Sequence, residues 1–141
     1  MRRLRFEALQ CIARMRGHLV ILADNAATAR AWGADGIYAA ANRLPANNSS
    51  LLRIATAHDM AEIAQANRAA ADAVMLSPVF ATRSHPDGRV LGVPRFLALA
   101  RHAHMPVIAL GGLNAAGARR LKCRRWAAID GLSDPHFSAR A

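Results

Sequence analysis

Hydroxyl, imidazole and guanidinium groups gather in one stretch of the chain, five residues after the apolar run AVML (73–76). The residues concerned are Thr82, Arg83, Ser84 and His85. Hydroxyl and cationic side chains at such spacing can bind the oxygens of a phosphate or pyrophosphate. The turn formers that follow, PDG (86–88), make a solvated loop without a ligand an equally simple interpretation.

Two adjacent glycines form a second candidate anion site. Gly111 and Gly112 stand between the apolar run PVIAL (106–110) and Asn114, which can cap a following helix. Glycines in that place allow backbone N–H groups to approach a phosphate closely. A tight turn that binds nothing would use the same residues, so the pattern leaves both interpretations open.

Asp24 is the candidate metal ligand, because it follows the apolar run HLVILA (18–23) and carboxylate oxygens suit Mg²⁺. A helix N-cap explains it equally well. His58 lies in a similar place, as a site residue or a residue near a cap. Asp35 and Asp72 each precede an apolar run, which is the opposite end, and we expect structural roles for them.

The elements that position these residues alternate along the chain. Apolar runs predict six strands, at 18–23, 34–39, 52–57, 71–77, 105–112 and 125–130. Helices are predicted before the first strand and between most of the successive strands, over 3–16, 26–32, 58–70, 93–103 and 115–122. In the first helix the predicted apolar face consists of Leu4, Ala8, Cys11, Ile12 and Met15. The alternation indicates an α/β fold with a parallel sheet and right-handed crossovers, whose ligands lie at the carboxyl ends of the strands.

Composition narrows the class of protein. The 141 residues are 53% hydrophobic, which suits one globular domain. The formal charge of +10 arises from 19 Lys and Arg residues that are mostly scattered, so no specific nucleic-acid partner is expected, although phosphates and RNA should be attracted at low salt. Cys11 and Cys123 lack metal-ligand spacing and suit reduced thiols in the cytoplasm. No signal peptide or long apolar span is apparent, so no membrane association is expected.

Several segments together resemble the thiamine phosphate synthase/TenI family. GADGIYA, IATAH, ADAVMLSPVFATRSH and MPVIALGGLN occur in the family's order, over about residues 15–132. SPVFATRSH is similar to the family loop Gly-Pro-Val-Phe-x-Thr-x-[Thr/Ser]-Lys. The resemblance implies a single TIM-barrel-like domain over residues 1–141. It also implies synthesis of thiamine phosphate from hydroxymethylpyrimidine pyrophosphate and thiazole phosphate, with Mg²⁺ and release of pyrophosphate.

The resemblance also assigns roles to individual residues. It implies that Asp24 binds the metal, that Thr56 and His85 are catalytic, and that the remaining candidates bind phosphate groups. These phosphate-binding residues are Thr82 and Ser84 in the loop, and Gly111 and Gly112 after the fifth predicted strand.

Departures from the family pattern favour a second hypothesis, a non-catalytic or degenerate member that binds a phosphorylated heterocycle. His85 replaces the loop lysine, Arg43 lies near the place of the second metal carboxylate, and Asp130 ends the last predicted strand. Pro78 replaces the histidine that the sister tautomerase reaction needs. About six of the eight barrel strands are predicted, and the first two are missing. We therefore expect pairing with another copy, a truncated gene model or a decaying paralogue.

Overall fold

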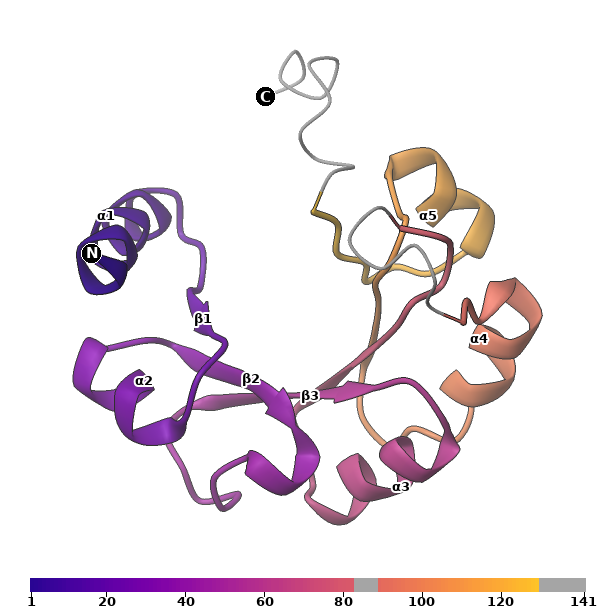
Figure 1. The fold of residues 1–141 in the computed structure, drawn as a ribbon, viewed down its shortest axis with the longest axis horizontal. Coiled ribbons are helices and arrows are strands. Elements are labelled where there is room, and N and C mark those ends of the chain that lie inside the picture. The colour runs from indigo at the N-terminus through magenta and orange to yellow at the C-terminus, as the bar shows by residue number, and fades with distance from the viewer. Residues whose placement is uncertain (83–88, 130–141) are drawn as a thin grey trace.

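The computed structural model describes residues 1–82 and 89–129. Five parallel strands form one sheet in the order β1-β2-β3-β4-β5. The strands are β1 (Ile21–Leu22), β2 (Gly36–Ala40), β3 (Leu52–Ala57), β4 (Ala73–Leu76) and β5 (Val107–Ala109). The sheet curves into an open horseshoe with helices along its convex side (Figure 1). The predicted α/β class with parallel βα repeats is therefore confirmed.

Three of the five helices begin at a capping side chain. The five helices are α1 (Arg2–Met15), α2 (Ala26–Trp32), α3 (Met60–Arg68), α4 (Gly92–Ala100) and α5 (Ala115–Leu121), with a 3-10 turn η1 at Ala41–Arg43. The side chains of Asn25, Asp59 and Asn114 accept hydrogen bonds from the N–H groups of the first turns of α2, α3 and α5. Thus Asn25 caps α2, and Asp24 does not.

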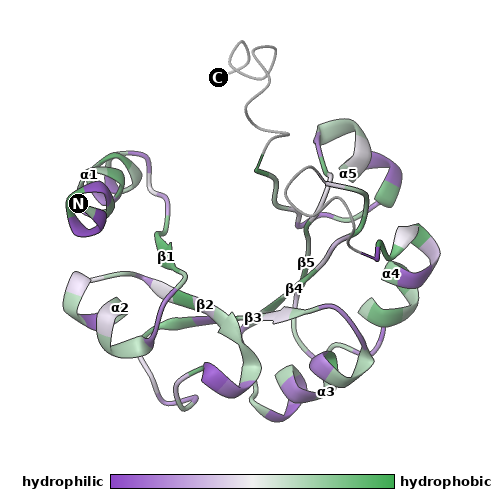
Figure 2. Cartoon of the chain, in the orientation of Figure 1, coloured by the Kyte–Doolittle hydropathy of each residue, from purple (hydrophilic) through white to green (hydrophobic). Residues whose placement is uncertain are grey.

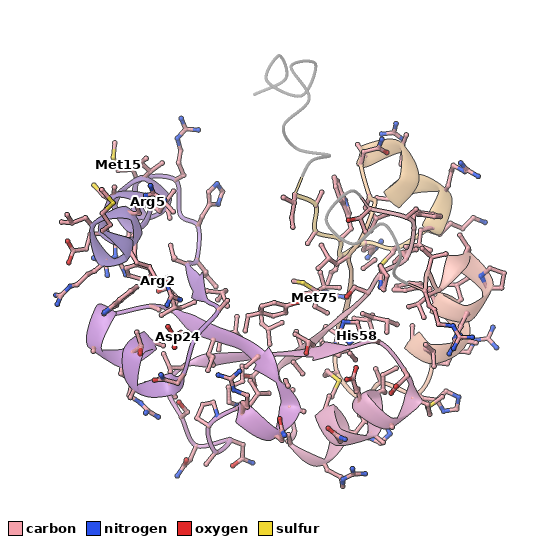
Figure 3. The ribbon with its side chains drawn as sticks, viewed as in Figure 1. Arg2, Arg5, Met15, Asp24, His58 and Met75 are labelled. Atoms are coloured by element: carbon pink, nitrogen blue, oxygen red, sulfur yellow. The ribbon has the colours of Figure 1, made fainter. Side chains whose placement is uncertain are left out.

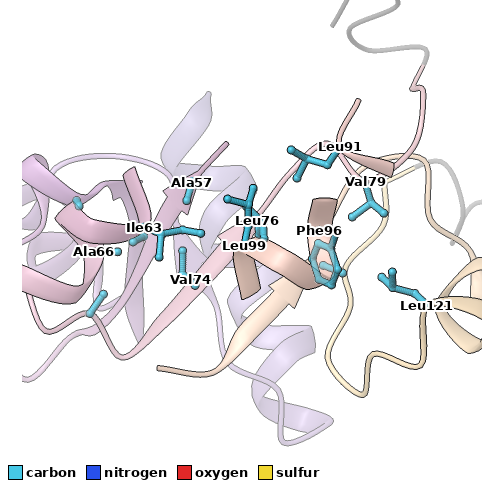
Figure 4. Close-up of a cluster of buried hydrophobic side chains, with 14 of the residues drawn as sticks. Ala57, Ile63, Ala66, Val74, Leu76, Val79, Leu91, Phe96, Leu99 and Leu121 are labelled. Carbon is cyan, nitrogen blue, oxygen red and sulfur yellow. The ribbon is translucent and has the colours of Figure 1, made fainter. Parts of the chain in front are cut away.

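Alternate strand residues divide the sheet into two faces. On the convex face, side chains from β3, β4 and β5 pack with α3, α4 and α5 in one buried cluster (Figure 4). Val74, Leu76, Ile63 and Phe96 in this cluster are at most 2% exposed. Figure 2 shows the apolar strands on the inner side of the horseshoe and, outside them, the helices, which carry hydrophilic residues. This burial holds the carboxyl ends of the strands in fixed positions.

The concave face carries the other half of each strand. Thr56 lies beside Met75, and Met75 lies beside Ile108, in the registers of β3, β4 and β5. All three side chains are half-buried. Figure 3 shows Met75 on the inner side of the horseshoe. Burial also raises the pKa of the Tyr38 hydroxyl above its usual value.

Two aspartates join neighbouring strands at the amino end of the sheet. Asp35 Oδ2 accepts a hydrogen bond from Val20 N at 2.7 Å, and Asp72 Oδ2 accepts one from Arg53 N at 2.8 Å. Each aspartate stands just before one strand, and its carboxylate accepts a hydrogen bond from the backbone of the neighbouring strand, near that strand's start. The expected structural role of both residues is confirmed.

The apolar face predicted for the first helix is wrong, although its bounds agree within a residue. Leu4, Ile12 and Met15 are 70%, 59% and 81% exposed, whereas Phe6 and Gln10 are buried. The Phe6 ring lies 5.4 Å from that of Trp32 in α2. Helix α1 stands at one end of the horseshoe and packs mainly on α2 (Figure 1), so only the side toward α2 is covered.

The sixth predicted strand, 125–130, is reduced to one parallel bridge between Ala109 and Trp126 within the described part of the chain, and residue 130 lies outside it. Two hydrogen bonds make this bridge: Ala109 N to Arg125 O, 3.0 Å, and Ala127 N to Ala109 O, 2.8 Å. A longer ladder after this bridge would need β5 to continue past Ala109, and β5 ends at that residue. No helix among the described residues has the length and apolarity to span a membrane.

Candidate functional site

The carboxyl ends of the five strands lie along one edge of the horseshoe, because all neighbouring strands are parallel. This edge holds four of the predicted site residues: Asp24 after β1, Thr56 near the end of β3, and Gly111 and Gly112 after β5. Thr82 follows β4 and is half-buried. Ser84 and His85 lie outside the described residues, so their predicted roles stay predictions.

Asp24 pairs with an arginine from the first helix. Arg2 Nη1 lies 2.8 Å from Asp24 Oδ2, and the backbone N–H of Asn25 donates to Oδ1 at 2.7 Å. The guanidinium of Arg2 also lies 5.6 Å from the Trp32 ring centre. These contacts join the start of α1 to the end of β1 (Figure 3). Asp24 therefore stabilises the α1 position, whatever ligand the edge receives.

The same contacts lower the pKa of the Asp24 carboxyl below its usual value. The Asn25 N–H hydrogen bond is the largest cause; partial desolvation opposes it, and the contacts with Arg2 and a smaller attraction to Arg43 lower the pKa further. Because the folded-state pKa is the lower one, this contribution to stability is present above the unfolded-state pKa and is lost as the pH falls through the folded-state value.

Replacing Arg2 by Ala is therefore expected to raise the pKa of Asp24 toward, but not to, its ordinary value, since the Asn25 hydrogen bond persists. Carbon-13 chemical shifts of the Asp24 carboxyl across a pH titration would measure this change. The matched variant Arg3→Ala removes a charge whose partner is Glu7 and should leave the pKa of Asp24 in place. An equal shift in both variants would contradict the assignment to Arg2.

Gly111 and Gly112 allow two loops to touch. Val79 N donates to Leu110 O at 2.9 Å, and Phe80 N donates to Gly111 O at 3.0 Å. A Cβ on Gly111 would lie 2.7 Å from Pro78 Cα, and a Cβ on Gly112 would overlap Ala81 O. Both glycines also have positive φ angles, +106° and +59°. The tight-turn interpretation thus has direct support, and phosphate binding by these glycines stays a prediction.

His58 makes a pair that the sequence analysis missed. Its Nδ1 lies 2.8 Å from Glu62 Oε2, which also accepts the His58 backbone N–H at 2.7 Å. Glu62 N in turn donates to Asp59 Oδ1 at 2.9 Å. The spacing Asp-x-x-Glu at a helix start is the signal that could have revealed this arrangement. The pair fixes the His58 ring at the carboxyl end of β3.

The structure brings the candidates to one edge without joining them into one cluster. Asp24 lies near one end of the horseshoe and Gly111 follows β5 toward the other (Figures 1 and 3). Among the described residues no group of three His, Cys, Asp or Glu side chains could hold a metal ion. The edge offers hydroxyl, imidazole and guanidinium groups that can bind an anion, and it also carries the carboxylates of Asp24, Asp59 and Glu62.

Comparison with known proteins identifies the family. The family model described as thiamine monophosphate synthase matches residues 2–132. The chain belongs to this family. Its match to nearly all described elements means that the open sheet is a TIM-barrel-like α/β arrangement of thiamine monophosphate synthase type, as the resemblance implied.

Individual relatives agree. The thiamine-phosphate synthase of Chloroflexus aurantiacus is 32% identical over 117 residues, covering 78% of this chain and 54% of that protein. That of Roseiflexus castenholzii is 31% identical, covering 96% of this chain and 65% of that protein. The solved thiamine phosphate pyrophosphorylase from Pyrococcus furiosus superposes with a TM-score of 0.70 at 25% identity, over 86% of this chain and 61% of that one. The chain spans about half the length of the first of these relatives.

Proposed function

We propose that the chain takes part in thiamine phosphate synthesis, in which hydroxymethylpyrimidine pyrophosphate and thiazole phosphate combine and pyrophosphate leaves. The observation that carries this proposal is the family match over residues 2–132, with relatives named thiamine-phosphate synthase. These names favour the synthase over the alternative of a binder without turnover. Free cysteines at Cys11 and Cys123 suit a reducing compartment, and we propose the cytoplasm.

The reaction sets two demands on the site. The bond between the pyrimidine methylene carbon and the pyrophosphate oxygen breaks, and a new bond forms from that carbon to the thiazole nitrogen. Departing pyrophosphate develops negative charge that the site must stabilise. The row of cationic and hydroxyl groups along the carboxyl edge supports this role, with Thr56 facing the same side as Met75 in the half-buried inner face.

Mg²⁺, which the resemblance implies, does not fit the described part of the edge. Asp24 is the predicted metal ligand there, and its two oxygens already face Arg2 and the N–H of Asn25. Among the described residues, no group of three His, Cys, Asp or Glu side chains that could hold a metal ion includes it. The proposal therefore assigns no step to a metal and assigns charge stabilisation to the side chains themselves.

The test is whether the chain forms thiamine phosphate from the two purified substrates. The thiamine phosphate is measured by the fluorescence of the compound that it gives on oxidation. Thr56→Val is expected to lower kcat/KM by at least about tenfold, because it removes a hydroxyl and keeps the shape. Thr56→Ser is the matched control and should retain activity. Binding of thiazole phosphate without any product would contradict the synthase proposal and favour the binder.

A further inference from the structure

The corner of the site formed by β1 and β2 carries more positive than negative charge. Arg2 pairs with the carboxylate of Asp24 at 2.8 Å, and Arg43 adds a weaker electrostatic attraction to it. Arg43 ends the turn η1 that follows β2, so it stands at the carboxyl end of the strand next to β1. Its side chain is exposed and has no ion pair among those of the described residues.

Arg2 keeps donors available after its pairing with Asp24. Its Nη1 serves the carboxylate and its Nη2 approaches Ala23 O at 3.4 Å, whereas a guanidinium has five N–H donors. The side chain is 63% exposed. An anion can therefore reach this guanidinium without breaking the contact with Asp24.

The same geometry opposes a divalent cation. Mg²⁺ needs a near-octahedral shell of oxygen atoms and loses its water reluctantly. At Asp24 it would have to share Oδ2 with Arg2 or Oδ1 with the Asn25 N–H. It would also stand beside two guanidinium groups of its own sign, which raises the electrostatic cost. Arginine, in contrast, binds phosphate oxygens through paired N–H donors.

We propose that this corner binds the pyrophosphate group directly on Arg2 and Arg43, with Asp24 as the counter-ion that holds Arg2 in place and with no divalent metal among the ligands. The inference deepens the proposed function and rests on it for the choice of pyrophosphate. It assigns Arg43 a place in substrate binding, and it gives Asp24 a positioning role instead of a metal-binding one.

Calorimetric titration with sodium pyrophosphate, in EDTA and in millimolar MgCl₂, tests this proposal on the purified chain. We expect equal dissociation constants in the two buffers, within about twofold. Arg43→Ala should weaken binding about tenfold, and Arg2→Ala by a similar factor. Asp24→Asn should not weaken it, because the amide keeps an oxygen that can accept from Arg2 while a negative charge near the anion is removed. The control Arg68→Ala removes an exposed arginine at the end of α3, at the opposite edge of the sheet, and should leave binding unchanged.

A second measurement keeps the proposal independent of folding defects and of turnover. Manganese paramagnetic resonance should show no bound ion at Asp24, so the spectra of the parent chain and of Asp24→Asn should be the same. Circular dichroism would verify that each variant is folded. Pyrophosphate binding that requires Mg²⁺ and disappears in Asp24→Asn would overturn the proposal, as would an absence of pyrophosphate binding in both buffers.

The two proposals can fail separately. Thiamine phosphate formation together with Mg²⁺-dependent pyrophosphate binding would overturn the arginine site and leave the proposed function standing. Pyrophosphate binding in EDTA, without any thiamine phosphate formed, would overturn the proposed function and leave the arginine site standing.

Discussion

Gly112→Ala is expected to lower the free energy of unfolding by about 2–5 kcal/mol, the sum of a backbone cost and a steric cost. The backbone cost arises because φ at Gly112 is +59°, in the left-handed region that side chains disfavour. The steric cost arises because the new Cβ would overlap Ala81 O and lie 2.9 Å from Phe80 Cβ. Both contacts belong to the segment that leads from β4 into the candidate phosphate loop.

Gly17 supplies the matched control. Its φ is +66°, nearly that of Gly112, but no atom lies within 4 Å of the position that a Cβ would occupy. Gly17→Ala should therefore cost about 1–2 kcal/mol, the backbone part alone. Urea unfolding of both variants measures the difference. Equal losses would mean that the contact between the two loops contributes nothing to stability.

Arg53→Ala is the second large effect, with an expected loss of about 3–5 kcal/mol. Arg53 lies in β3 and is 2% exposed, yet its guanidinium donates to three backbone carbonyls, those of Pro45, Ala69 and Ala70. Its Nε also lies 3.5 Å from Asp72 Oδ2. Removing the side chain takes this donor away from the three carbonyl oxygens and opens a cavity where the buried side chain was, and each adds to the cost.

Two comparisons separate the causes of this loss. Asp72→Asn removes the charge but keeps an oxygen for the Arg53 N–H, and Asp72 is 42% exposed, so we expect about 1 kcal/mol or less. Arg68→Ala, at an exposed position, should change stability by less than about 0.5 kcal/mol. Thermal and urea unfolding provide the measurements. A loss for Asp72→Asn as large as that for Arg53→Ala would show that the ion pair, and not the carbonyl contacts, holds this corner.

Local signals predicted the elements well. The side chain that could cap each of α2, α3 and α5 was visible in the sequence, because only Asn and Asp at those places can bind the free N–H groups of the first turn. What the sequence left open was which neighbour would cap, Asp24 or Asn25, His58 or Asp59. That choice depends on the path of the preceding strand, which adjacent residues do not specify.

Long-range packing set the limits of the prediction. Helical spacing marked Leu4, Ile12 and Met15 as one apolar stripe, but which stripe is covered depends on the neighbours that a helix has, and α1 contacts α2. The shortening of the first predicted strand to Ile21–Leu22 has a related cause, because β1 pairs on one side only.

The candidate site was predicted in part. The carboxyl edge and the residues on it followed from the βα alternation and from the family resemblance. The partner of Asp24 did not, since Arg2 lies 22 positions earlier and meets it only because α1 folds back along α2. The glycine pair was correctly marked as unusual, but the close contact with the segment from Pro78 to Ala81 belongs to the tertiary structure.

The consecutive strand order has a consequence for how the chain folds. Strands that are neighbours in the sheet are also consecutive in sequence, and their paired residues lie 15 to 33 positions apart, from Ile21 with Gly36 to Val74 with Val107. The entropy cost of closing a loop grows only slowly with its length, so these crossovers cost similar amounts of chain entropy. The sheet can therefore grow from β1 to β5 in the order in which a ribosome releases the chain, each new unit docking on the one already folded. Within the described sheet, each strand finds its partner in a neighbouring βα unit.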